Sequence, residues 1–306
     1  MWIIFYILSE FAVNMCVRQE VPPIDIGRFP SMTTRVERIL ILAKTYPSPS
    51  AKHAETSCVA GINDRGEARR LYPVPFRMIS GDQQFQKWQW IDVRVEKSSA
   101  DHRPESHKIY VDTIQVRERI PTKEKWCTRR LWWEKLPLYD SFELMDGERS
   151  GRGMSLAILR PKRLVRLEIV SVSEPDWTEE EMAKLLQEQS QGNLFSRDEE
   201  RKHLKRLEKL PFDFYYHYVC ETPAGEEVRK HKIVDWEVGM FFRTCRTNYG
   251  AGWEAPFRAK LELDFAEKDL IFMMGNMHRF PHQWLIISLI YPPKRVPPDD
   301  SQSSLF

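Results

Sequence analysis

The chain has 306 residues, of which 42% are hydrophobic and 29% charged, enough for the folded core of one large domain or two ordinary ones. With 13 Gly and 20 Pro it is neither collagen-like nor of low complexity. A formal net charge of +2 at pH 7 excludes a polycationic binder of the histone type.

The first 17 residues contain two apolar runs that resemble a membrane segment. Ser9, Glu10 and Asn14 interrupt them well short of the ~20 residues needed to span a bilayer. A signal peptide requires a positively charged segment before its apolar run, and no Lys or Arg precedes these runs. We therefore expect no membrane segment, a natural start at Met32, and an upstream extension or disordered tail over residues 1–31.

The cysteines are odd in number, and no pair has the close spacing of a zinc knuckle or a redox CxxC motif. The simplest interpretation is free thiols in a reducing cytoplasm, so we expect a cytoplasmic protein. The five are Cys16, Cys58, Cys127, Cys220 and Cys245.

Short strand-like runs with turn signals between them follow. The segment 88–96 alternates apolar and charged residues, which is typical of a half-buried strand, and residues 63–66 have hairpin-turn chemistry. Together they predict a small barrel of the OB or SH3-like kind inside an N-terminal β-rich domain, residues 32–173. We expect the β pattern to continue past the tryptophans, through a Gly-rich turn at Gly147, Gly151 and Gly153. The predicted strands are Ile39–Tyr46, Thr56–Ile62, Trp88–Glu96, Lys108–Val116 and Leu164–Val172.

An acidic segment rich in helix-forming residues interrupts this pattern. Thr178 and Glu181 match a capping box, and leucines recur at helical spacing on both sides of Gly192. These features predict a charged helical connector over residues 174–210.

The last β-rich unit is predicted as an α+β domain over residues 211–295, followed by a disordered tail over 296–306. The fold class is therefore α+β, with two β-rich units (small OB-like or SH3-like barrels) separated by a charged helical segment. Its predicted elements are a strand at Phe212–Cys220, a helix at Ile233–Thr247, and strands at Ala259–Phe265, Leu270–Met274 and Gln283–Tyr291.

Several short blocks resemble an uncharacterised prokaryotic family that carries paired OB-like barrels. They are Ile39–Lys44, Cys58–Ile62, Arg70–Val74, Ser155–Lys162, His231–Glu237, Met274–Asn276 and Trp284–Pro293. The resemblance extends loosely from residue 36 to 295, by short words and their order. It implies a bacterial or archaeal origin and a connection with nucleic acid or nucleotides, since OB-like barrels commonly bind such ligands. It implies no catalytic residue.

A basic, tryptophan-rich stretch is the first candidate for function. Grooves that bind single-stranded nucleic acid need cations to neutralise phosphates and aromatic faces on which bases stack. Alternatively, the tryptophans form the core of a β unit and the arginines a solvated face. The candidate binding residues are Arg69, Arg70, Arg77, Lys125, Trp126, Arg129, Arg130, Trp132, Trp133, Arg160, Lys162 and Arg163.

The polar loop 101–108 could supply a general base, or a phosphate clamp from Arg103 and Lys108. Its spacing matches no catalytic motif, and a solvated hairpin loop is the alternative.

If the segment from His231 to Glu237 is helical, His231 and Asp235 are neighbours on one face, four residues apart.

His231, Asp235 and Glu237 are weak catalytic candidates, although an acidic residue at a helix start also stabilises the helix dipole. His278 and His282 are weak candidates for metal binding or for contact with a base, and Pro281 argues against a continuous helix there.

Signature motifs of P-loop NTPases, dinucleotide-binding enzymes, zincins and serine hydrolases are missing from the sequence. The favoured function is binding of single-stranded nucleic acid or a nucleotide, without a cofactor. A phosphodiester hydrolase that requires a divalent metal, and a non-catalytic subunit that binds a protein partner, remain the alternatives.

Overall fold

The computed structural model describes residues 34–47, 56–77, 79–174, 176, 178–181, 183 and 209–295. The predictions for residues 1–31, for most of the connector at 174–210 and for the tail at 296–306 lie outside them. The strands are β1 (Arg35–Lys44), β2 (Ser57–Asn63), β3 (Ala68–Val74), β4 (Gln89–Lys97), β5 (Ser106–Ile109), β6 (Gln115–Arg119), β7 (Leu138–Tyr139), β8 (Leu156–Leu159), β9 (Arg163–Ser171), β10 (Phe212–Thr222), β11 (Gly225–Ile233), β12 (Ile271–Asn276) and β13 (Trp284–Ile290). The helices are α1 (Cys127–Trp133), α2 (Phe142–Arg152), α4 (Trp236–Tyr249), α5 (Glu254–Arg258) and the π-helix η6 (Ala259–Asp264), with short 3-10 turns η1 (Gly81–Gln83), η2 (Val111–Thr113), η3 (Glu124–Trp126) and η5 (Gly250–Gly252).

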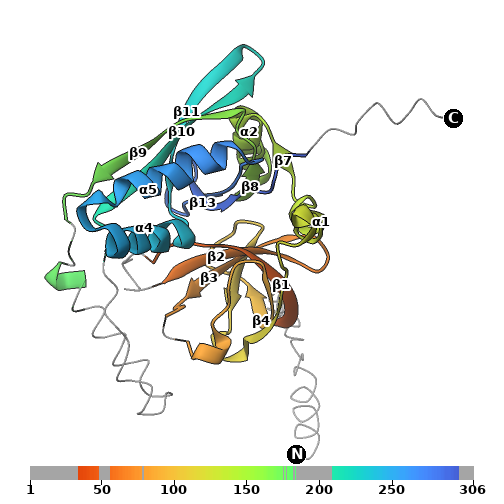
Figure 1. The fold of residues 1–306 in the computed structure, drawn as a ribbon. Coiled ribbons are helices and arrows are strands. Elements are labelled where there is room, and N and C mark those ends of the chain that lie inside the picture. Colours follow the sequence, from red (N-terminus) through yellow and green to blue (C-terminus); the bar gives the residue numbers. More distant parts are fainter. Residues whose placement is uncertain are drawn as a thin grey trace, which may run out of the picture. The chain divides into compact units, whose positions relative to one another are not determined.

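The first five strands close into a barrel in the order β1-β2-β3-β5-β4, because β4 also pairs with β1 (Figure 1). β3 and β5 run parallel and the other barrel pairs are antiparallel. This Greek-key arrangement is that of an OB fold, one of the two kinds of small barrel that the sequence predicted for this unit. The second β-rich unit forms a sheet and not the second small barrel that was also predicted. Alternation in β4 points Ile91, Val93 and Val95 inward, and the turn before β3 places Gly66 at a φ of 88°.

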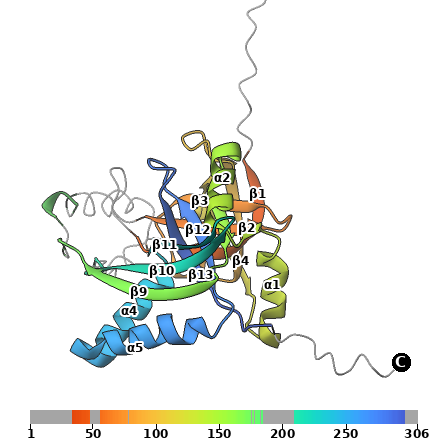
Figure 2. The same cartoon turned by 90° about the horizontal axis from the view of Figure 1, so that it is seen from above.

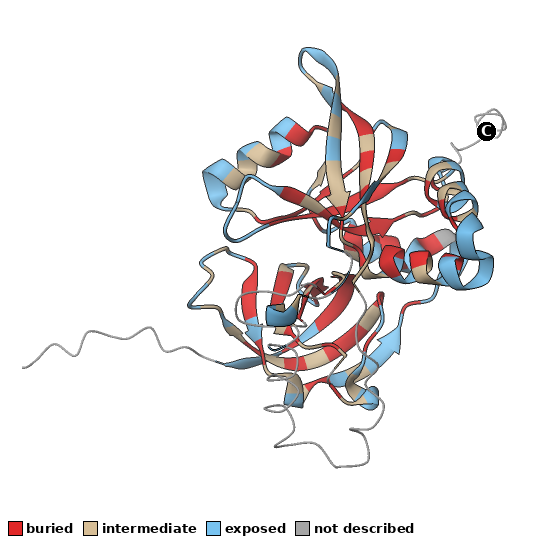
Figure 3. Cartoon of the chain, turned by 90° about the vertical axis from the view of Figure 1, so that its left-hand side faces the viewer, coloured by how far each residue is buried: buried red, intermediate tan, exposed pale blue. Residues whose placement is uncertain are grey.

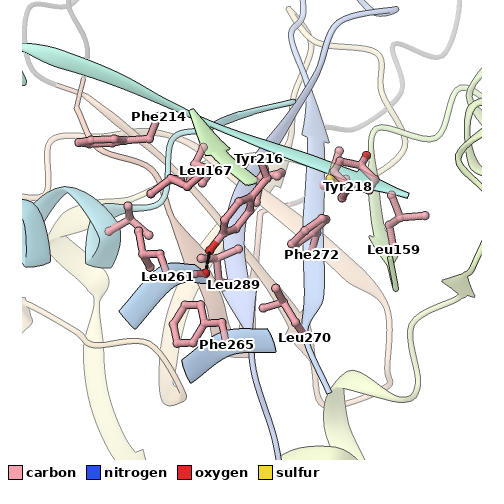
Figure 4. Close-up of a cluster of buried hydrophobic side chains, with 14 of the residues drawn as sticks. Leu159, Leu167, Phe214, Tyr216, Tyr218, Leu261, Phe265, Leu270, Phe272 and Leu289 are labelled. Atoms are coloured by element: carbon pink, nitrogen blue, oxygen red, sulfur yellow. Dashed lines mark hydrogen bonds between the residues drawn. The ribbon is translucent and has the colours of Figure 1, made fainter. Parts of the chain in front are cut away.

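Seven strands form the second β-rich unit, in the order β7-β8-β12-β13-β11-β10-β9. Helices α4 and α5 run alongside this sheet (Figures 1 and 2), and the side chains between them form an aromatic core. Tyr216 is fully buried there and donates its hydroxyl proton to the Leu261 carbonyl at 2.7 Å (Figure 4). The predicted α+β class is confirmed, and strands β7, β8 and β9 from residues 138–171 belong to this sheet.

The outer face of the barrel packs against the other face of the sheet. Leu40 and Ala60 of the barrel lie in one apolar cluster with Ile158, Met273 and Ile287 of the sheet. Most residues of these strands are buried, as the burial colours show (Figure 3), although β1 begins with the exposed Arg35 and Val36. The barrel face over β1 and β2 is therefore covered by the chain's own second sheet.

Helix α1 closes this junction at one end. Four residues of this segment are buried: Trp126, Arg129, Arg130 and Trp133. The last three follow Trp126 by three, four and seven residues, the spacing of one helical face. The sequence-based prediction of a continuing β pattern was wrong here, because the helical spacing of these four residues was overlooked.

Three other predicted elements also differ from the structure. The predicted strand Lys108–Val116 is divided between β5 and β6 by the 3-10 turn η2. Gly147 and Gly151 lie inside α2, and only Gly153 adopts the left-handed conformation that ends this helix. The predicted strand at 259–265 is the helix η6, because Leu261 and Phe265, four residues apart, both face the aromatic core.

The capping box is confirmed by reciprocal hydrogen bonds between Thr178 and Glu181, at 3.0 and 3.2 Å. In the part of the chain that the structure describes, no helix has the length and apolar character to cross a membrane.

Replacing Trp133 with Ala should lower the free energy of unfolding by about 3–5 kcal/mol, because this side chain is fully buried between α1 and the junction. Urea denaturation measures the change. Leu131→Ala on the same helix is the matched control, since Leu131 is 67% exposed and its loss should cost less than about 0.5 kcal/mol. Equal losses in the two variants would contradict this role of Trp133.

Candidate nucleic-acid interface

The basic, tryptophan-rich stretch does not form an exposed surface. The guanidinium group of Arg129 lies 4.8 and 4.7 Å from the ring centroids of Trp88 and Trp126, which contact each other, and donates two hydrogen bonds to the Ile120 carbonyl. Arg130 donates to the Pro293 carbonyl at 2.8 Å. These guanidinium groups fasten α1 to the barrel and to the segment after β13. The physical reason is that a long arginine stem can be buried when its head finds carbonyl acceptors.

The arginines of β3 are also buried. Arg69 forms a paired contact with the buried Glu37, at 2.6 and 3.0 Å, and a further one with Glu67. Arg70 donates to the Ser155 carbonyl of the sheet at 2.6 Å. Neither side chain can reach a ligand on the barrel surface in this arrangement.

The remaining candidates are more exposed but already have partners. Arg160 pairs with Asp269, while Lys162 and Arg163 both pair with Glu226. Arg77 is half-buried, Trp132 is half-buried against Trp90, and the side chain of Lys125 lies outside the described residues. The eleven candidates whose side chains the structure describes therefore do not gather into one cationic groove.

The weak catalytic candidates are placed on different elements. His231 lies in β11, not in a helix, and its Nδ1 is 2.8 Å from the Tyr218 hydroxyl oxygen. Burial, together with the nearby Arg229, lowers the pKa of His231 to about 4. The imidazole is therefore neutral at physiological pH and packs against Phe142.

Asp235 is buried and caps helix α4. Its carboxylate accepts hydrogen bonds from the backbone N–H groups of Glu237 and Leu289, at 2.7 and 2.9 Å. Burial raises its pKa, which Lys87, 3.8 Å away, partly opposes. Asp235 therefore performs the helix-capping role that the sequence offered as the alternative to catalysis.

The fold brings together two loops that are more than 170 residues apart in sequence. Arg103, in the loop between β4 and β5, forms a paired contact with Asp101 and donates to the backbone and side-chain oxygens of Asn276, at 2.8 and 3.0 Å. His278, in the loop between β12 and β13, approaches Asp101 to 3.3 Å. One guanidinium group thus fastens a barrel loop to a sheet loop.

The Asp101 carboxylate keeps its negative charge at this junction. Burial would raise its pKa, but hydrogen bonds from Arg103 and Ser106 hold the pKa well below its usual range. Lys97 donates to the carbonyls of Arg103, Pro104 and Ser106, which fixes the path of the barrel loop.

We call the outer side of these two loops, residues 98–105 and 277–283, with the neighbouring ends of β3 and β5, the paired-loop surface. Its side chains combine positive charge, imidazoles and aromatic rings. Phe280 is 46% exposed, and Tyr72 and Lys108 follow the last paired residues of the parallel strands β3 and β5. The exposed members are Tyr72, His102, Lys108, Met277, His278, Arg279, Phe280 and His282.

Sequence reasoning named both loops separately but not their contact. The sequence shows that each loop is polar and contains histidines. It contains no pattern that predicts the contact between Arg103 and Asn276. Neither His278 nor His282 gathers with other ligands, since no group of three or more His, Cys, Asp or Glu residues suited to a metal occurs among the residues described.

Acid should destabilise the protein through His231. Its folded pKa of about 4 lies below the ordinary value of 6.5, so between these values the unfolded chain binds more protons. The free energy of unfolding should fall as the pH drops from 6.5 to 4, by at most about 1.4 kcal/mol per pH unit from this group. His231→Gln should flatten this slope in urea denaturation at several pH values. His282→Gln, at an exposed position, should leave the slope unchanged; an identical effect of both would refute the assignment.

Comparisons with known proteins divide the chain after α1. Residues 35–135 match the family described as "Domain of unknown function (DUF8758)", and residues 140–306 match "Domain of unknown function (DUF8757)". No curated protein matches the chain.

Among solved structures, the chain is similar to one titled "Structure and Conformational Change of a Replication Protein A Heterotrimer Bound to ssDNA". The identity is 9% and the TM-score 0.20, and the match covers 88% of this chain and 66% of that chain. A likeness this weak carries no conclusion about a ligand. The family match over residues 140–306 covers more than half of the sequence, and the chain therefore belongs to the DUF8757 family, with a DUF8758 domain preceding it.

Proposed function

We propose that the chain binds single-stranded nucleic acid at the paired-loop surface. The observation that carries this proposal is the pair of hydrogen bonds from Arg103, which join the β4–β5 loop of an OB barrel to Asn276, the last residue of β12 before the β12–β13 loop. In OB folds the face over strands 2 and 3 and the loops 1–2 and 4–5 are the usual contacts for oligonucleotides.

The burial of the barrel face over β1 and β2 favours the paired-loop surface, because that face is not accessible to a ligand. The outer sides of β1 and β2 pack on the sheet through Leu40, Ala60 and Ile62, so a strand of nucleic acid cannot lie across them. The loop between β4 and β5 remains at the edge of this junction, with His102 exposed at its tip.

Binding at this surface uses charge and stacking. Lys108 and Arg279 are exposed cations that neutralise phosphates, and Phe280 offers a ring face on which a base stacks. Asp101 does not repel phosphates strongly, because Arg103 forms a paired contact with its carboxylate. The arrangement contains little that could read base edges, so weak sequence preference is expected.

Fluorescence anisotropy with labelled single-stranded DNA and RNA, in about 50 and 200 mM salt, tests the proposal. Binding should weaken as salt rises, and Arg279→Ala or Lys108→Ala should each reduce the slope of log affinity against log salt by about one. Phe280→Ala should cost roughly 1 to 3 kcal/mol of binding free energy.

Lys260→Ala is the matched control, because the Lys260 side chain is 44% exposed on η6, which packs on the face of the sheet opposite the barrel, and pairs with Asp264. It should bind as the unmodified chain does. Salt-independent binding, no binding, or equal losses in Lys260→Ala and Arg279→Ala would contradict the proposal. Complete absence of binding would favour the alternative of a subunit that binds a protein partner.

A further inference from the structure

The last residue of β1 is a lysine enclosed by aromatic rings. Lys44 Nζ lies 3.3 Å from the ring centroid of Phe76, 4.6 Å from that of Trp236 and 6.0 Å from that of Phe85. The rings also contact one another, since Phe76 packs edge-on against both Phe85 and Trp236, at 5.0 and 5.7 Å between centroids. We call these three rings the aromatic box.

The box is built from separate segments of the chain. Phe76 follows β3, Phe85 precedes β4, and both are buried in the barrel core. The Tyr46 N–H donates to the Val234 carbonyl at 2.8 Å, which holds the end of β1 beside the start of α4, where Trp236 lies. Core packing and backbone pairing therefore fix the walls of the box around the Lys44 amine.

The Lys44 amine has no polar partner among the residues described: no hydrogen bond and no ion pair joins it to them. Lys230 provides the contrast. Its Nζ lies 4.5 Å from the ring centroid of Tyr215 but also 3.0 Å from a carboxylate oxygen of Glu168. Both lysines contact a ring, and only Lys230 has a carboxylate to compensate its charge.

Two carboxylates near the box oppose the neutral amine but do not outweigh burial. Asp235 and Glu237 favour the charged form of Lys44, yet Lys87 lies 3.8 and 3.6 Å from them and compensates their charge. The rings also attract an ammonium group, but they do not replace the three hydrogen bonds that it donates in water. Burial therefore lowers the pKa of Lys44 from 10.5 to about 8.

The amine can be reached from one side. Lys44 and Trp236 are half-buried and Glu237 is exposed, so the box opens to solvent at the start of α4. A lysine held in an apolar, partly open site is the usual form of a nucleophilic amine, because a substantial fraction of it is neutral near physiological pH.

We propose that Lys44 is a reactive amine that forms an imine with small apolar aldehydes at the aromatic box. The neutral nitrogen attacks the carbonyl carbon, and a C–N bond forms. The nitrogen gives up its two protons, and both leave with the former carbonyl oxygen as water. A C=N double bond thus replaces C=O, and the reaction needs no oxidant or reductant. This site does not depend on the nucleic-acid proposal.

The test compares two lysines in the same molecule. The full chain is treated at pH 7 with propanal and sodium cyanoborohydride, which reduces each imine to a stable alkylamine, and mass spectrometry of peptides follows Lys44 and Lys230. Lys44 should be alkylated roughly tenfold faster than Lys230, because more of it is neutral than of an ordinary lysine. Alkylation of Lys44 at the rate of Lys230 or below would overturn the proposal.

A second comparison assigns the effect to the box. Trp236→Ser admits water to the amine, so the ratio of the Lys44 rate to the Lys230 rate should fall by roughly fivefold. Trp236→Leu keeps the site apolar, and the ratio should not fall. An unchanged ratio in a folded Trp236→Ser chain, or an equal fall in both variants, would refute the role of burial in the box. The comparison of Lys44 with Lys230 in the unmodified chain decides the proposal even if Trp236→Ser does not fold.

Discussion

The packing of the OB barrel against the seven-stranded sheet is the constraint on which the rest of the structure depends. Leu40 and Ala60 on the barrel meet Ile158, Met273 and Ile287 on the sheet, and all five are almost completely buried. Burial of apolar surface on this scale is the main source of stability in such a junction. It also covers the barrel face that OB folds commonly offer to a ligand, which is why the proposed function places binding elsewhere.

Polar groups at the rim of this packing fix its geometry. Glu105 of the barrel is buried, and its carboxylate accepts hydrogen bonds from the N–H and hydroxyl of Ser155, at 3.0 and 2.8 Å. Arg103 joins the same barrel loop to Asn276. Satisfied buried polar groups specify one arrangement, since sliding the barrel along the sheet would leave each of them without a partner. The paired-loop surface is a product of that fixed register.

Ser155 connects the barrel to the sheet at this rim. Its carbonyl accepts a hydrogen bond from Arg70 of β3, while its hydroxyl and N–H donate to the carboxylate of Glu105. One residue of the sheet unit thus contacts two buried side chains of the barrel.

Local sequence patterns determined much of the fold. The alternation in β4, the turn that ends at Gly66 and the capping box of Thr178 and Glu181 are properties of neighbouring residues, and each was visible before the structure. The OB-like barrel and the α+β class follow from them. The helical spacing from Trp126 to Trp133 was equally visible, but the aromatic content of the segment suggested strands instead.

What the sequence determined by itself was therefore the class of fold and the types of residue available for binding, because these depend on periodicity and composition over short distances. Only the tertiary structure decided which charges are accessible. The sequence predicted Arg70 and Arg129 as surface cations, but both are buried. Their hydrogen-bond acceptors are the carbonyls of Ser155 and Ile120, which belong to other segments of the chain. The proposed function depends on the contact between Arg103, in the β4–β5 loop, and Asn276, at the end of β12. This contact also joins distant segments, so neither segment alone predicts it.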